Sequence, residues 1–150
     1  MDRENSISPS LEDYLEIIYK IIKEKQVARS KDISEYLKVR SASVTNALQT
    51  LKSKNLINYA PYEVVTLTKE GELQAEDITK RHENIKKYLL TTLGIDSVKA
   101  ENTACKFEHE LDPDVFKRIL HFNRFCKENR EIVGKFFDSF FDFCRNQKIE

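Results

Sequence analysis

The hydrophobic pattern of this chain changes its period once, between residues 56 and 68, and this change decides the fold class. The segment LINYAPYEVVTLT is rich in β-branched and aromatic residues, and Val65 and Leu67 stand two residues apart, as in a half-buried strand. Pro61 and Tyr62 stand at the middle of the segment, where a turn would reverse the chain. These residues predict a two-stranded hairpin.

Three helices are predicted before the hairpin. Apolar residues recur at helical spacing from residue 10 to residue 25, where Ser10 and Asp13 are spaced as a capping box. Helices over residues 30–37 and 41–54 follow, separated only by a short polar break. A helix, two helices joined by a short turn, and a hairpin, in this order, predict a winged helix-turn-helix.

The remainder of the chain is predicted to be helical throughout. The expected helices span residues 69–93, 97–111, 113–126 and 132–144. Gly94 is placed to end the first of these, and Asp112 with Pro113 supplies an N-cap and a first helical residue for the third. We therefore expect a mostly α fold, with a DNA-binding domain over residues 1–71 and a helical domain over residues 72–150.

Composition excludes several classes of protein. The chain has 150 residues, too few for a large multidomain enzyme, and its three Gly and three Pro argue against collagen-like or disordered chains. No apolar run approaches the roughly 18 residues of a membrane span, and the start MDRENS lacks a signal peptide's apolar core. Three cysteines, an odd number, argue against a secreted disulfide framework. We expect a soluble, cytoplasmic protein without a membrane partner.

Positive charge is concentrated in one window. The chain's 25 basic and 25 acidic residues cancel, but residues 25–54 alone carry a net charge of about +5. This window contains the second helix of the predicted motif, which enters the major groove, where Asn and Gln can bond adenine edges. We expect DNA contacts from Arg29, Arg40, Ser41, Ser43, Thr45, Asn46, Gln49 and Tyr62. The alternative for the helix is an ordinary solvated polar face.

Three sets of residues are candidates for metal binding. Cys105, Glu108 and His109 stand at positions i, i+3 and i+4, so a helix would place a thiolate, a carboxylate and an imidazole on one face. The alternative is a buried cysteine beside an exposed Glu–His pair. The set on the first helix is Asp13 with Glu16, and the third is His82, which interrupts the apolar stripe of the long helix. Taken alone, Asp13 fits a helix cap, Glu16 a solvated carboxylate and His82 a core histidine.

Several motifs together resemble a known family. The succession SLEDYLEIIY, a winged helix-turn-helix, KRH and then ACKFEHEL resembles the diphtheria toxin repressor and manganese transport regulator family of metal-dependent repressors over about residues 8 to 125. The resemblance implies that Asp13 and Glu16 match the first-helix ligands of manganese-type members and that His82 matches the ligand on the long helix. It further implies that residues 105–109 match the C-x-x-E-H site of iron-type members, where manganese-type members carry Glu in place of Cys.

The chain departs from the family pattern at two points. Lys86 stands where the iron-type ancillary site carries Glu, although Glu101, one turn before Cys105, could supply a replacement oxygen. The SH3-like third domain of longer members is not expected here. The Phe-rich segment 132–144 lies outside the matched part, and we expect a dimer interface to bury it. We expect Cys126 and Cys144 to be structural thiols.

The function implied is that of a homodimeric, metal-activated transcriptional repressor that controls metal homeostasis genes and is not an enzyme. Its cofactor would be Fe(II) or Mn(II), and its partner double-stranded operator DNA. The first-helix ligands belong to the DNA-binding domain and the later ligands to the dimerisation domain, so one ion would fix the two domains against each other. A thiolate at Cys105 favours Fe(II) over Mn(II).

Two other functions are compatible with parts of the pattern. A winged-helix regulator could sense oxidants through its cysteine thiols and need no metal. A small metalloenzyme could use the Cys/Glu/His cluster, but the chain offers neither an additional base nor a Gly-rich substrate loop. Metal-dependent retention of DNA would separate these alternatives.

Overall fold

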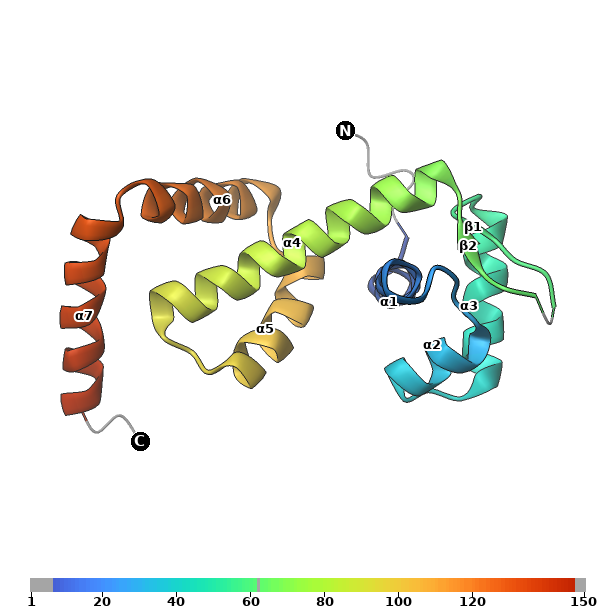
Figure 1. Ribbon diagram of the computed structural model, residues 1–150, viewed down its shortest axis with the longest axis horizontal. Coiled ribbons are helices and arrows are strands. Elements are labelled where there is room, and N and C mark those ends of the chain that lie inside the picture. Colours follow the sequence, from blue (N-terminus) through green and yellow to red (C-terminus); the bar gives the residue numbers. More distant parts are fainter. Residues whose placement is uncertain (1–6, 62, 148–150) are drawn as a thin grey trace. The chain divides into compact units, whose positions relative to one another are not determined.

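The computed structural model describes residues 7–61 and 63–147, and the fold is mostly helical (Figure 1). The elements in order are α1 (Pro9–Lys25), α2 (Ser30–Leu37), α3 (Ser41–Ser53), β1 (Ile57–Asn58), β2 (Thr66–Leu67), α4 (Lys69–Leu93), α5 (Ser97–Glu110), α6 (Pro113–Glu128) and α7 (Arg130–Asn146). The predicted fold class, a winged helix-turn-helix followed by a helical domain, is confirmed.

Contacts between residues divide the chain within α4. The winged unit ends at Thr79 and the helical unit begins at Lys80. The predicted boundary between residues 71 and 72 also lies in α4, and it stays a prediction. None of the helices in the described residues is both long and apolar enough to cross a bilayer.

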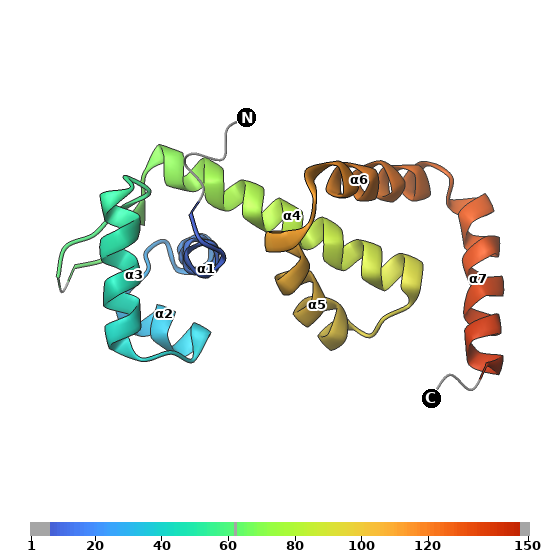
Figure 2. The same ribbon diagram turned by 180° about the vertical axis from the view of Figure 1, so that it is seen from behind.

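In the winged unit α1, α2 and α3 pack against one another, and α1 and α3 also contact the hairpin (Figure 2). β1 and β2 are antiparallel, with Ile57 opposite Leu67, and a further bridge joins Ala28, just before α2, to Val65. The core is continuous and apolar because each helix contributes a buried stripe. Its fully buried side chains include Leu15, Ile18, Ile33, Leu48 and Leu51.

The start of α1 differs from the prediction. The predicted capping box of Ser10 and Asp13 is wrong, because α1 begins at Pro9 and its N-cap is Ser8. The Ser8 side chain makes no capping hydrogen bond. Proline at the first helical position explains this start, since its fixed φ suits a helix and it has no N–H to satisfy.

Glycine is required where the hairpin meets α4. A Cβ atom on Gly71 would lie 1.8 Å from the backbone oxygen of Leu56, so only a residue without a side chain fits there.

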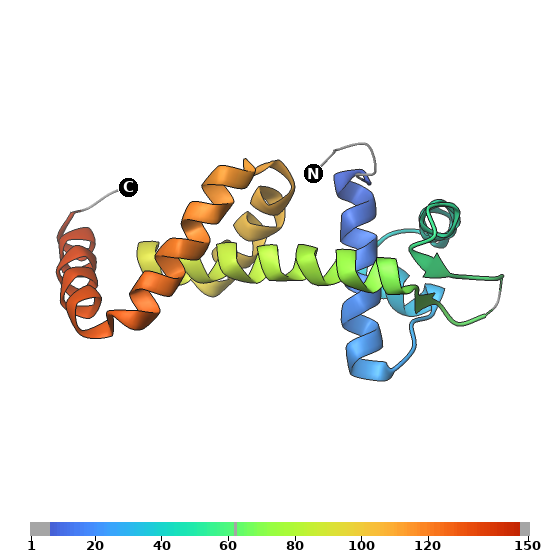
Figure 3. The ribbon, with the colours of Figure 1, turned by 90° about the horizontal axis from the view of Figure 1, so that it is seen from above.

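The helical unit packs α5 and α6 against the second half of α4 (Figure 3). Gly94 ends α4 with a left-handed φ of 64°, as predicted. The Asp112 side chain accepts a hydrogen bond from the Asp114 N–H at 2.8 Å, and Pro113 begins α6, which also agrees with the prediction. The core consists of Ile85, Leu89, Ala100, Ala104 and Ile119. Helix α7, which the structure describes throughout, contains no buried residue.

Candidate metal centre and DNA-binding surface

Both ring nitrogens of His82 on α4 face carboxylates of α5. His82 is buried, with 1% of its surface exposed. Its Nδ1 atom lies 2.6 Å from Oε2 of Glu108, and its Nε2 atom lies 3.1 Å from Oε1 of Glu101. The ring is therefore held between two carboxylates rather than among apolar side chains alone.

Cys105, Glu108 and His109 share one face of α5, as their spacing predicted. The ligand atoms of His82, Cys105 and Glu108 all lie within 4.8 Å of one another. Metal bonds to N, O and S measure about 2.0 to 2.3 Å, so donors on opposite sides of one ion lie about 4 to 4.6 Å apart. These three donors therefore fit around one divalent ion after small adjustments.

The burial of these side chains is the opposite of what the structural alternative predicts, namely a buried cysteine beside an exposed Glu–His pair. Cys105 is exposed, whereas Glu108 has 1% of its surface exposed. Nε2 of His109 lies 3.4 Å from Oε1 of Glu108, and the Arg81 guanidinium donates to the Glu108 backbone oxygen at 3.0 Å. The alternative of a buried cysteine beside an exposed Glu–His pair is wrong, because Glu108 points inward toward His82 and α4 covers it. The Arg81 contact joins residues 27 positions apart and could not be predicted from spacing along the chain.

Glu101 lies on the other side of the His82 ring. Its Oε2 accepts from Nζ of Lys86 at 2.7 Å, while Oε1 faces the ring. The hydrogen bond from Lys86 lowers the pKa of the Glu101 carboxyl below its usual value, and partial burial opposes this shift. Glu101 is not among the three donors that converge, and its predicted role as a ligand stays a prediction.

Asp13 and Glu16 belong to the winged unit. They lie one turn apart on α1, and Glu16 is buried and pairs with Nζ of Lys20 at 3.1 Å. Asp13 is half-buried. Their roles as ligands stay predictions.

In the basic window, residues 25–54 of the winged unit, two lysines form ion pairs with acidic side chains of the same window. Lys25 pairs with Asp32 at 2.8 Å and Lys31 with Glu35 at 3.8 Å, and the bond from Lys25 lowers the pKa of the Asp32 carboxyl. Among the described residues, no ion pair involves Arg29, Lys38, Arg40, Lys52 or Lys54. These side chains are exposed and can meet phosphates.

Helix α3 separates a buried face from a polar face. Val44, Ala47, Leu48 and Leu51 point into the core. The exposed predicted contacts are Arg40, Ser41, Ser43, Asn46 and Gln49. Thr45 is half-buried, and its hydroxyl donates back to the Ser41 oxygen at 3.0 Å, so it has less to offer a base.

A groove of about 390 Å³ runs between the start of α2, the face of α3 and the hairpin. It brings together Arg29, Thr45 and Gln49 from the predicted set. Tyr59 and Ser30 also line the groove and were not predicted as DNA contacts. The aromatic residues of the predicted hairpin could have indicated Tyr59. Tyr62 lies outside the described residues.

A winged helix-turn-helix with a basic face, followed by helices that gather an imidazole, a thiol and a carboxylate, defines a DNA-binding regulator with a candidate metal site. Two family profiles match the chain: iron dependent repressor, N-terminal DNA binding domain, over residues 6–65, and iron dependent repressor, metal binding and dimerisation domain, over residues 68–132. The chain belongs to this family of metal-dependent transcriptional repressors.

Individual relatives agree with this assignment. An uncharacterised HTH-type transcriptional regulator of Methanocaldococcus jannaschii is 37% identical over 117 residues, which are 77% of this chain and 94% of that protein. The HTH-type transcriptional regulator MntR of Lysinibacillus sphaericus is 35% identical over 128 residues, 85% of this chain and 91% of that protein. These relatives are transcriptional regulators, and none of these similarities supports an oxidant sensor.

Solved structures share the fold. IdeR of T. acidophilum is 26% identical with a TM-score of 0.67, and the manganese regulator SloR is 25% identical with a TM-score of 0.68. Each match covers 77% of this chain and 54% of the solved chain. The chain therefore spans about half the length of these solved structures.

Proposed function

We propose that this protein is a homodimeric repressor of metal homeostasis genes, activated by Fe(II) in preference to Mn(II). The observation that carries the proposal is the convergence of His82, Cys105 and Glu108 within 4.8 Å. With His109 beside Glu108, the cluster offers nitrogen, sulfur and oxygen donors, which suit first-row divalent metals. A bound ion would supply a fixed positive charge with directed bonds to these side chains.

The ligand set would tie helices of the helical unit together. His82 lies on α4 and Glu108 on α5, so side chains that hold one ion would fix α4 against α5. Asp13 and Glu16 are proposed as further ligands on the resemblance alone. Through them, metal binding in the helical unit would influence the winged unit, and metal and DNA would then strengthen each other's binding.

Cys105 is the residue proposed to select the metal. The family profile is named for iron and the relative SloR is a manganese regulator, so the comparisons support both metals. A thiolate is a poor ligand for Mn(II), whereas Fe(II) accepts it, and Fe(II) also exceeds Mn(II) in the general order of affinity. Carboxylate ligands suit both ions, so the thiolate decides.

The exposed face of α3 is proposed to read the operator. Asn46 and Gln49 would bond base edges in the major groove, while Arg29 and Arg40 would bind phosphates. Their exposure supports this role, as do the neighbouring basic side chains that form no ion pair among the described residues.

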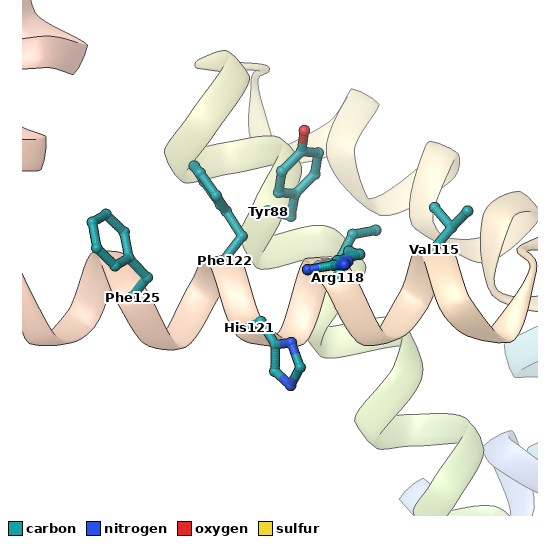
Figure 4. Close-up of a pocket in the computed structure, with 7 residues that line it drawn as sticks. Tyr88, Val115, Arg118, His121, Phe122 and Phe125 are labelled. Atoms are coloured by element: carbon teal, nitrogen blue, oxygen red, sulfur yellow. The ribbon is translucent and has the colours of Figure 1, made fainter.

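A second copy of the chain is proposed to cover the apolar surface of the helical unit. On α6 and α4, an open groove of about 490 Å³ is lined by Tyr88, Val115, Arg118, Ile119, His121, Phe122 and Phe125. Phe122 and Phe125 point from α6 toward the side on which Tyr88 of α4 lies, while His121 points the opposite way (Figure 4). Phe136 and Phe143 on α7 are also more than half exposed. Apolar surface of this extent favours self-association.

The test of activation is operator binding, measured by fluorescence anisotropy under anaerobic conditions at one salt concentration, because phosphate contacts are screened by salt. We expect tight binding with Fe(II), weaker binding with Mn(II) and release by excess chelator. Cys105→Glu should shift the preference toward Mn(II), and Cys144→Ser, which changes a thiol on α7, should not. Equal operator affinity with chelator and with saturating metal would contradict the proposal.

The test of the reading face uses Arg40→Ala and Asn46→Ala. Each should weaken operator binding by about 1 to 3 kcal/mol and leave metal affinity in the absence of DNA unchanged. Arg145→Ala, on α7, is the matched control. If both variants bound the operator as the parent does, the exposed face of α3 would not be the surface that reads the operator.

A further inference from the structure

The two nitrogens of His82 have different surroundings. Nδ1 lies 2.6 Å from Glu108, a member of the converging donor cluster. Nε2 lies 3.1 Å from Glu101, whose second oxygen is held by the Lys86 ammonium at 2.7 Å. One nitrogen thus faces the donors, and the other faces a carboxylate whose charge is already balanced.

A neutral imidazole binds a metal through one nitrogen, and the other nitrogen keeps its proton. This N–H donates a hydrogen bond to an acceptor, and that hydrogen bond fixes the orientation of the ring and the choice of ligand atom. Glu101 offers that acceptor, and Lys86 holds the carboxylate from its other side. Glu108, in contrast, stands with Cys105 among the donors.

Resting on the proposed function, we propose that Glu101 is a positioning residue rather than a metal ligand: it accepts the Nε2–H of His82, directs Nδ1 to the ion, and is itself held by Lys86. Three consecutive contacts carry this assignment, from Lys86 to Glu101, from Glu101 to Nε2, and from Nδ1 toward Glu108. The role proposed from sequence, an oxygen ligand at residue 101, is replaced by one that acts through the histidine.

The ammonium of Lys86 has a defined part in this arrangement. Lys86 lies on α4 one turn after His82, and Glu101 reaches both side chains from α5. The lysine therefore keeps the carboxylate against the ring and supplies the positive charge that a metal would otherwise bring. A divalent ion at Glu101 would have to displace this ammonium.

The experiment compares Glu101→Ala, Glu101→Gln and Lys86→Met with the parent chain, and uses Lys87→Met, an exposed lysine on the same helix, as the matched control. Affinity is measured by anaerobic titration with Co(II), whose visible spectrum reports coordination number and thiolate ligation. Helicity of each variant is checked by circular dichroism. The protonation of the His82 nitrogens is read from long-range ¹H–¹⁵N spectra of the Zn(II)-loaded protein.

We expect Glu101→Ala to lower metal affinity by about 10- to 100-fold with the Co(II) spectrum of the loaded site unchanged. Glu101→Gln should restore most of the affinity, because its amide oxygen still accepts the Nε2–H. Lys86→Met should cause a smaller loss and Lys87→Met none. The ¹⁵N spectra should show a protonated Nε2 and a metal-bound Nδ1.

Three results would overturn the assignment. Glu101→Gln could lose as much affinity as Glu101→Ala with an altered Co(II) spectrum, as expected for a direct ligand. The ¹⁵N spectra could show metal on Nε2, or all variants could bind like the parent. Failure of the parent chain itself to bind Co(II) or Zn(II) would instead contradict the proposed metal site, so the two failures are distinguishable.

Discussion

The winged unit and the helical unit bury different kinds of side chain. The winged unit has a continuous core of large aliphatic residues such as Leu15, Leu48 and Leu51. The helical unit has a small core in which two residues are alanines, and it also buries His82 and Glu108. Apolar burial dominates the first unit, although it also buries Glu16, whereas the second unit buries an imidazole and a carboxylate side by side, groups that are costly to bury without partners.

Surface aromatics add to this difference. Phe125, Phe136 and Phe143 in the helical unit are each about half exposed or more, whereas the winged unit encloses most of its large apolar side chains. The comparison indicates that the winged unit is a self-sufficient scaffold for DNA contacts. We expect the helical unit to gain part of its stability from the proposed metal and from the proposed second copy.

The largest expected effect is a cavity in the winged unit. Leu48→Ala removes a fully buried side chain and should lower the free energy of unfolding by about 2 to 5 kcal/mol. Leu73→Ala, which makes the same change at a residue 56% exposed, is the control. Urea denaturation followed by circular dichroism measures both, and equal effects of the two variants would refute the idea of a self-sufficient core.

Metal should stabilise the helical unit by a comparable amount. At a free metal concentration 100 times Kd, binding should add about 2.7 kcal/mol, detected as slower hydrogen exchange in α5. His82→Ala should abolish this gain, and His121→Ala, which changes an exposed histidine on α6, should retain it. Slower exchange on metal addition in the His82 variant would place the ion elsewhere.

Loss of one exposed aromatic should weaken self-association. Phe136→Ser removes a side chain 66% exposed in the single chain, and burial of such a group contributes about 1.5 to 3 kcal/mol. Analytical ultracentrifugation should show dissociation at higher concentrations than for the parent. Lys135→Ser, next to it in sequence, should associate normally, and unchanged association of the Phe136 variant would show that α7 lies outside the interface.

The smallest expected effect is a gain of stability in α7. A Cβ atom at Gly134 would meet nothing within 4 Å, so Gly134→Ala should stabilise the helix by about 0.5 to 1 kcal/mol. Thermal unfolding of the helical unit measures this gain. A destabilised variant would mean that a partner approaches this glycine closely.

Features that depend on local spacing were available from the sequence. The change of period between residues 56 and 68 predicted the hairpin, and Gly94 and Asp112 predicted the ends of helices that the structure contains. Residues i, i+3 and i+4 share a helix face wherever the helix packs, so the common face of Cys105, Glu108 and His109 could also be predicted. The predicted capping box at Ser10 was wrong, because Pro9, one residue earlier, supplies an equally local start for the helix.

Only the tertiary structure decided which side chains meet across helices. Nothing in the spacing indicated that His82 would lie between Glu101 and Glu108, or that Lys86 would hold the outer oxygen of Glu101. Such contacts depend on the register in which α5 packs against α4, and small apolar residues such as Ala100 and Ala104 permit several registers by hydrophobicity alone. Helical geometry determined which side chains share a helix face, and the packing of α5 against α4 determined which side chains of the two helices are in contact.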